Sequence, residues 1–214
     1  LKEDPGSKFE EKPRSYLGIH EQKQVGLFFA GIHIPVGRLN VEDLQAFAQA
    51  SIIYGDGNLR LTEDQNIIIS GIAEHKIKSF KEDLLLKKFS LKPGAIAGGT
   101  VSCTGNTYCS FALTNTKDQA LKISKELDSE IILPEEIKIH WTGCPNSCGQ
   151  AYMGAIGLTG KKAKNSKGET VEAYDISIGG QQGPHRQIAK LEAKSISADE
   201  IKETLKQILI TYYS

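Results

Sequence analysis

Residues 140–150 read HWTGCPNSCGQ and hold two of the chain's four cysteines, Cys144 and Cys148, with three residues between them. The other two, Cys103 and Cys109, begin and end the stretch CTGNTYC, with five residues between them. Each pair follows a run of strand-forming residues and stands beside glycine, and 34 residues separate the pairs. Glycine-rich turns free backbone N–H groups, which can hydrogen-bond to sulfur. The pattern indicates two loops whose thiols act together.

Four interpretations of these thiols are open. Scattered core cysteines are common, but Gly, Asn, Thr and Pro flank both pairs here. Two disulfides need an oxidising compartment, and the sequence carries no secretion signal. Structural zinc sites usually have about two to four residues between paired ligands, which the first pair exceeds. A [4Fe–4S] cluster takes four thiolates and tolerates this spacing, so residue chemistry favours the cluster.

Length and charge exclude several classes of protein. The chain has 214 residues, enough for one large or two small domains, and its formal net charge is zero. A neutral chain gives no sign of a nucleic-acid partner, and no apolar run approaches the roughly 20 residues of a membrane helix. The N-terminus lacks the basic start and apolar stretch of a signal peptide. Because residue 1 is Leu rather than Met, we expect a piece of a longer or processed chain.

The first part of the chain predicts a small mixed unit. Residues 1–24 are charged, contain Pro and Gly, and are expected to form a linker or extended arm. Over 25–92 we expect a strand, a helix at 41–54 capped by Asn40, a strand–turn–strand in LRLTEDQNIIIS, and a second helix near 74–88. The expected apolar face of the helix at 41–54 consists of Val41, Leu44, Phe47, Ala48 and Ile52.

Residues 93–214 predict a second mixed unit that carries the cysteines. A helix is expected from about 109 to 127, and its first turn would bring a positive dipole end near the thiolates. EIKIHWTG predicts a strand that leads into Cys144, and AIGLTG and AYDISIGG predict a strand pair. Ser197 and Glu200 predict a capping box at the start of a final helix.

The cysteine stretches resemble the paired C-x5-C and C-x3-C signature of the sirohaem nitrite and sulfite reductases. The stretch GIHIPVGRLNVEDLQAFAQASIIYGDGNLRLTEDQNIII resembles the unit that precedes the cluster domain in that family. TGN after Cys103 and HWTGCPN are more similar to the ferredoxin-dependent nitrite reductases of cyanobacteria and plastids. The resemblance implies an α+β fold, in which a small ferredoxin-like α/β half-unit precedes an α/β domain carrying the [4Fe–4S]/sirohaem cysteine loops.

The same resemblance implies the roles of particular residues. All four cysteines would ligate one cubane, and Cys148 would also bridge to the sirohaem iron. Asn146 matches a family position beside the sirohaem, and Gln65 and Asn66 match a turn whose side chains approach the macrocycle. The first cysteine loop adds two further candidates, Thr104 and Asn106. For each of these polar residues the alternative is a turn former that caps its own backbone.

The resemblance also implies a function. The chain would be the cluster- and sirohaem-binding half of an assimilatory nitrite reductase in the cytoplasm or plastid stroma, reducing nitrite to ammonia with electrons from ferredoxin. The missing N-terminal half of the same enzyme would supply the residues that hold nitrite, so the isolated chain is expected to be inactive. The alternatives are a sulfite reductase half, a small self-dimerising sirohaem protein, a haem-free iron–sulfur electron carrier and a zinc-stabilised interaction module. No nucleic-acid or membrane partner is expected.

Overall fold

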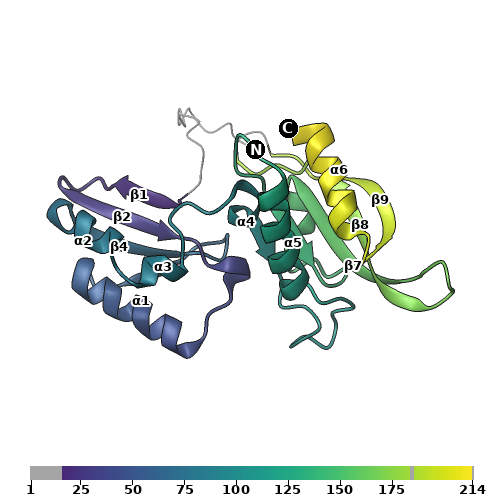
Figure 1. Ribbon diagram of the computed structural model, residues 1–214, viewed down its shortest axis with the longest axis horizontal. Helices are drawn as coiled ribbons and strands as arrows, with labels where there is room; N and C mark the ends of the chain where they lie inside the picture. Colours follow the sequence, from purple (N-terminus) through teal and green to yellow (C-terminus); the bar gives the residue numbers. More distant parts are fainter. Residues whose placement is uncertain (1–15, 184–185, 214) are drawn as a thin grey trace, which may run out of the picture.

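The computed structural model describes residues 16–183 and 186–213 and contains two β-sheets that lie side by side, each with its own helices (Figure 1). The first sheet has the order β1-β2-β4-β3, and the second has the order β5-β6-β7-β8-β9. The predicted α+β class is therefore confirmed. Among the residues described, no helix has the length and apolar character that a membrane-spanning segment requires.

The first sheet is antiparallel throughout. Its strands are β1 (Gly18–Glu21), β2 (Leu27–Ile32), β3 (Leu59–Leu61) and β4 (Ile67–Ala73). The helical segments of this unit are η1 (Pro35–Gly37), α1 (Val41–Tyr54), η2 (Glu74–Lys76), α2 (Ile77–Lys81) and α3 (Leu85–Lys88). Phe47 of α1 packs with Ile32 of β2, Ile69 of β4 and Phe89 in one buried cluster. This cluster gives the first unit a hydrophobic core of its own.

The second sheet is mixed, because β5, β6 and β7 run parallel while β8 and β9 are antiparallel to their neighbours. Its strands are β5 (Thr100–Ser102), β6 (Ile139–Thr142), β7 (Ile156–Lys164), β8 (Thr170–Ile178) and β9 (Lys190–Ser197). Its helical segments are α4 (Ala95–Gly98), α5 (Lys117–Glu130), η3 (Ala151–Met153) and α6 (Ile201–Tyr213). Trp141 and Tyr174 meet edge to face in the core, where Leu127 of α5 and Leu205 of α6 are also buried. The helices α5 and α6 thus shield this sheet from water.

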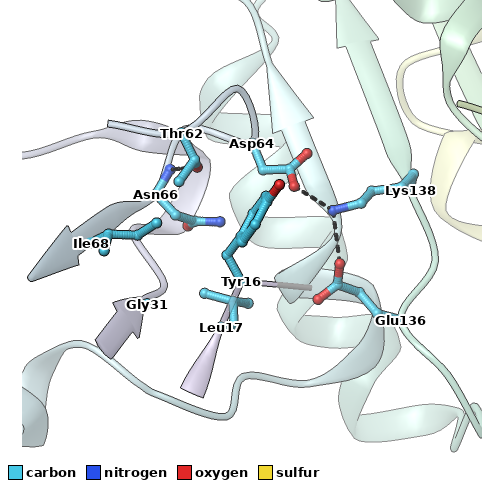
Figure 2. A pocket seen from close by; sticks show the side chains of 9 residues that line it. All are labelled: Tyr16, Leu17, Gly31, Thr62, Asp64, Asn66, Ile68, Glu136 and Lys138. Atoms are coloured by element: carbon cyan, nitrogen blue, oxygen red, sulfur yellow. Dashed lines mark hydrogen bonds and ion pairs between the residues drawn. The ribbon is translucent and has the colours of Figure 1, made fainter. Parts of the chain in front are cut away.

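Polar contacts join the two units. Lys138, next to β6, forms ion pairs at 2.8 Å with Asp64 of the β3–β4 turn and with Glu136, as Figure 2 shows. Arg38 and Asp118 form a further ion pair at 2.5 Å. Val36 of η1 is buried in the core of the second unit rather than the first. The first unit is therefore anchored beside the strands β5 and β6.

Several predicted elements are confirmed. The strand expected near 25–34 is β2, and the strand–turn–strand at 59–70 is the β3–β4 pair. Helix α1 has the predicted bounds, and the Asn40 side chain accepts a hydrogen bond from the Asp43 N–H at 2.7 Å. Glu200 accepts bonds from the hydroxyl and the N–H of Ser197, at 2.7 and 3.4 Å, just before α6 begins at Ile201. This is one half of the predicted capping box, because the Glu200 N–H donates to the carbonyl of Ser197 and not to its hydroxyl.

Other expectations were wrong. The helix expected from 109 begins at Lys117, because residues 103–116 instead form a loop that bonds to itself and to Gly143, the residue after β6. The N–H of Leu113 donates to Gly143 O at 2.7 Å, and the N–H of Asn106 donates to Thr114 O at 3.0 Å. The positive, N-terminal end of α5 therefore lies at Lys117 and not at Cys109, where it was expected.

The helix expected near 74–88 is divided into η2, α2 and α3, and the Asp83 side chain accepts the N–H of Leu85 at the start of α3. The predicted apolar face of α1 is also wrong, because Val41 and Ile52 are 67% and 71% exposed. Apolar residues occur on every side of this helix, and the side that packs is centred on Phe47 and Ala50.

Two strands were not expected. Strand β1 lies within residues 1–24, which were expected to be a linker or extended arm, and it pairs with β2. Residues 1–15 of that range lie outside the described part. Strand β9 pairs with β8 and completes the second sheet.

Candidate metal centre

The two cysteine loops leave the same edge of the second sheet. Cys103 follows the last residue of β5, and Cys144 lies two residues after the end of β6. These strands are parallel neighbours, with Ser102 opposite Trp141. Since the carboxyl ends of parallel strands lie at one edge, the loops begin side by side. The topology therefore brings together two sequence segments that 34 residues separate.

Backbone hydrogen bonds tie Cys103 to the second loop. Its N–H donates to Trp141 O at 3.0 Å, and its Sγ accepts the N–H of Gly143 at 3.1 Å. The Thr116 hydroxyl donates to the Cys103 carbonyl at 2.7 Å. A peptide N–H that points at sulfur stabilises negative charge there, which a thiolate ligand requires.

Two glycines allow the loops to approach. A Cβ at Gly149 would lie 2.2 Å from Trp141 O and 3.4 Å from the Cys103 nitrogen. A Cβ at Gly143 would lie 2.9 Å from the Cβ of Ala112, in the loop that carries Cys109. A side chain at Gly143 would push the two loops apart, and one at Gly149 would push the second loop away from β6. Steric contact therefore explains why glycine occupies positions 143 and 149.

Turns place the remaining cysteines. The N–H of Cys109 donates to Gly105 O at 3.1 Å, and the N–H of Ser147 donates to Cys144 O at 3.2 Å. Ser147 and Gln150 have left-handed backbones, with φ of 56° and 55°. These turns leave Cys144 buried and Cys148 exposed, and all four cysteines are free thiols.

The donor set suits an iron–sulfur cluster in its chemistry. Four free thiols on two adjoining loops, with a backbone N–H directed at one sulfur, match the ligands that a [4Fe–4S] cluster takes. In the described residues, however, no three or more His, Cys, Asp or Glu side chains are grouped so that they could hold a metal ion. The four-cysteine ligand set therefore stays a prediction.

Gln65 reaches the start of the first cysteine loop. Its Oε1 accepts the Ser102 N–H at 3.2 Å, and its Nε2 donates to Ser102 O at 2.8 Å. Asn66 instead lies inside the first unit, where its Oδ1 accepts the N–H of Ile34 at 2.9 Å. The β3–β4 turn thus directs the Gln65 side chain to the residue before Cys103, whereas the Asn66 side chain stays inside the first unit.

The loop candidates Thr104, Asn106 and Asn146 are all exposed. Asn106 donates from Nδ2 to Glu172 of β8 at 2.8 Å, and the same carboxylate accepts the N–H of Asn115 at 2.8 Å. Glu172 therefore holds the loop of Cys103 and Cys109 at two points. A role for these three candidates in binding a cofactor stays a prediction.

Sequence reasoning missed Lys117 and Glu172. Lys117 was placed inside the expected helix, although TNT at residues 114–116 consists of types that start helices. Burial lowers the pKa of Lys117, and the Arg38 charge lowers it further, while Cys103 acts in the opposite direction. The sequence around Glu172 alternates as any strand does and carries no signal for its role.

His140 belongs to β6, the strand that leads into the loop of Cys144 and Cys148. Burial lowers its pKa, so the imidazole is neutral near pH 7. Its Nδ1 lies 3.1 Å from Gln150 O, and a carbonyl can only accept, so Nδ1 carries the proton. His140 thus supports the end of the second loop.

Comparison with known proteins gives two family matches. Residues 20–87 match the nitrite/sulfite reductase ferredoxin-like half domain, and residues 97–214 match the nitrite and sulphite reductase 4Fe-4S domain. The chain is 43% identical to the ferredoxin–nitrite reductase of Synechococcus elongatus, covering 92% of this chain and 38% of that protein. It is 41% identical to the chloroplastic ferredoxin–nitrite reductase of Oryza sativa subsp. japonica, covering 92% of this chain and 33% of that protein.

The fold has a counterpart among solved structures. The Mycobacterium tuberculosis NirA protein matches with a TM-score of 0.87 at 22% identity, over 95% of this chain and 38% of that one. At that identity the likeness shows a shared fold. The chain thus spans 33–38% of the length of these proteins.

Proposed function

The chain belongs to the nitrite and sulfite reductase family, and from this premise we propose that it is the cluster-bearing half of a ferredoxin-dependent nitrite reductase. The reaction would be the assimilatory reduction of nitrite to ammonia, with ferredoxin as the electron donor. The choice of nitrite is supported by relatives named ferredoxin–nitrite reductase, at 37–43% identity for the cyanobacterial and chloroplastic proteins. Their sources support a location in the cytoplasm or the plastid stroma.

A [4Fe–4S] cluster and sirohaem are the cofactors of this family. We assign Cys103, Cys109, Cys144 and Cys148 as the cluster ligands, and Cys148 as the ligand shared with the sirohaem iron. The exposure of Cys148 supports the shared role, because its thiol is open to a second group on the outer side of the loop. When bound, the cluster supplies single electrons and the sirohaem iron supplies the site for nitrite.

The chain's own residues would orient these groups. The N–H of Gly143 stabilises charge on Cys103 Sγ, and Glu172 holds the first loop through Asn106 and Asn115. Gln65 fixes Ser102, and hence the start of that loop. The exposed Asn146, between Cys144 and Cys148, would lie beside the sirohaem, with Thr104 and Asn106 on the facing loop.

The division into a half-domain at 25–92 and a cluster domain at 93–214 is part of the same proposal, and β1, from the range 1–24, joins the sheet of the half-domain. We expect nitrite to be held by residues from the N-terminal half of the complete enzyme. Tyr108 and Phe111, in the first cysteine loop, are 83% and 73% exposed. Apolar surface of this kind supports a second protein surface that covers the loop.

One observation carries the proposal: two cysteine loops leave adjacent parallel strands, and a peptide N–H of one loop bonds the sulfur of the other. Anaerobic reconstitution with iron and sulfide tests it. We expect about four irons per chain, and a marked loss of iron in each of the four Cys→Ser variants. Ser110→Ala, at an exposed residue next to Cys109, is the matched control and should retain the wild-type iron content. Stoichiometric zinc without iron would contradict the proposal.

An assay with reduced methyl viologen tests the reaction itself. The complete reductase should convert nitrite to ammonia, and Cys148→Ser should abolish this activity. The chain by itself should produce no ammonia, because the residues that hold nitrite would be absent. Turnover of sulfite in preference to nitrite would assign the chain to the other branch of the family.

A further inference from the structure

Lys117 lies where the two units and the first cysteine loop meet. It is the first residue of α5, and its ammonium donates to the carbonyl of Ser102 at 3.1 Å and to the carbonyl of Val36. Val36 belongs to η1 of the first unit and has a left-handed backbone with φ of 48°. Ser102 directly precedes Cys103. One side chain therefore joins the first unit to the residue before a proposed cluster ligand.

Ser102 is held from three sides. Its carbonyl accepts from both Lys117 and Gln65, which uses both lone pairs, and its N–H donates to Gln65. Its hydroxyl donates to the Cys103 carbonyl at 3.1 Å. The start of the cysteine loop therefore has little freedom to move. Lys117 is the charged member of this arrangement.

The positive charge of Lys117 has no carboxylate partner among the described residues at ion-pair distance. After burial, the groups that act on the pKa of Lys117 are the Arg38 guanidinium, which is paired with Asp118, and the thiol of Cys103. A half-buried ammonium that donates to carbonyls and lies near another cation is costly unless negative charge lies nearby. A cluster held by four thiolates carries net negative charge and would supply it.

We propose that Lys117 is a positioning residue for Cys103 whose charge raises the reduction potential of the cluster. This rests on the proposed function, because it requires a cluster at the four cysteines. An electron that enters the cluster adds one negative charge, so a cation close by stabilises the reduced state. The low dielectric around the half-buried ammonium strengthens that effect relative to a surface lysine.

The test is the midpoint potential of the cluster in the complete reductase, measured by redox titration with EPR detection. Lys117→Met keeps much of the side-chain length and removes the charge, and it should move the potential to a more negative value. Lys117→Arg keeps the charge and should stay close to wild type. Lys122→Met, which removes an exposed lysine from the same helix, is the control and should leave the potential unchanged.

Lys117→Gln provides a second neutral variant in case methionine prevents folding, since its amide can still donate to one of the two carbonyls. It should also lower the potential, and iron content shows whether the folded variants hold less cluster. The inference is overturned if both neutral variants titrate as wild type does, or if arginine shifts the potential as far as methionine. Wild-type protein without any cluster would instead refute the proposed function.

Discussion

At the scale of the residue, Gln65 shows how a strained backbone is held in place. Its φ of 62° lies in the left-handed region, which non-glycine residues other than Asn and Asp seldom adopt. The turn persists because the side chain makes two hydrogen bonds to Ser102, in the other unit. A left-handed residue of this kind costs about 1–3 kcal/mol, which two hydrogen bonds can offset. We infer that the turn serves the Cys103 loop rather than the first unit alone.

Gln65→Glu tests that inference. A carboxylate can still accept the Ser102 N–H but cannot donate to its carbonyl, so the unfolding free energy should fall by about 2 kcal/mol at pH 7. The loss should shrink below a pH of about 4, where a protonated Glu donates again. Chemical denaturation at pH 7 and pH 4 measures both effects. Glu63→Gln, at an exposed position in the same turn, should change stability by less than about 0.5 kcal/mol.

At the scale of the element, the sequence predicts which helices and strands exist better than where they begin. Ala112 and Leu113 extend the apolar spacing of α5 backwards, so periodicity alone places its start too early. Two contacts set the actual start: the Leu113 N–H donates to Gly143 O, just after β6, and the Asn115 side chain accepts the N–H of Asp118. The second belongs to the TNT stretch, whose signal the apolar spacing outweighed. The face of α1 that packs is likewise chosen by tertiary contact. The four cysteines, by contrast, can be singled out from the sequence by residue type and spacing alone, without knowing where a helix or strand begins.

The loop between β5 and α5 gives a prediction about Glu172. Glu172→Ala removes the acceptor of Asn106 Nδ2 and of the Asn115 N–H, so it should cost about 2 kcal/mol of unfolding free energy. Amide hydrogen exchange in residues 104–116 should rise more than in α6. Glu169→Ala, in the exposed hairpin next to β8, is the control and should leave exchange in that loop unchanged. Equal exchange in both variants would mean that Glu172 does not hold the loop.

The contact between α5 and α6 gives a prediction about pH. Glu130 accepts from Lys202 and Lys206, both at 2.7 Å, and these bonds lower its pKa from 4.5 to about 2. Because the folded pKa is depressed, the stabilisation is complete above 4.5 and disappears as the pH falls towards 2. The difference in unfolding free energy between wild type and Glu130→Gln should therefore be larger at pH 6 than at pH 3. Salt should reduce it at pH 6, and a difference independent of pH would contradict the assignment.

At the scale of the whole molecule, a network of charges joins the two units. Figure 2 shows the Lys138 ammonium between the carboxylates of Asp64 and Glu136, with the Tyr16 ring between this group and Asn66. Asp64 and Lys138 are 74 positions apart, and nothing in the sequence connects them. With Gln65 and Lys117 in the same interface, the first unit acts as a support for β5 and β6. The position of the cysteine loops thus depends on residues that local sequence cannot reveal.

Lys138→Met tests whether this network couples the two units. Burial lowers the pKa of Lys138, but its bonds to Asp64 and Glu136 outweigh this and raise it, so the ammonium is stabilised by the fold. A raised pKa means that the stabilisation is present below about 10.4 and disappears as the pH rises through the folded value. Removal of the cation leaves two half-buried carboxylates together, and we expect a loss of about 2 kcal/mol at pH 7. In a double-mutant cycle, Asp64→Asn should recover about 1 kcal/mol of that loss, because it removes one of the repelling charges. Lys87→Met, at an exposed position on α3, is the control. Additive effects of the Lys138 and Asp64 changes would show that the pair does not couple the units.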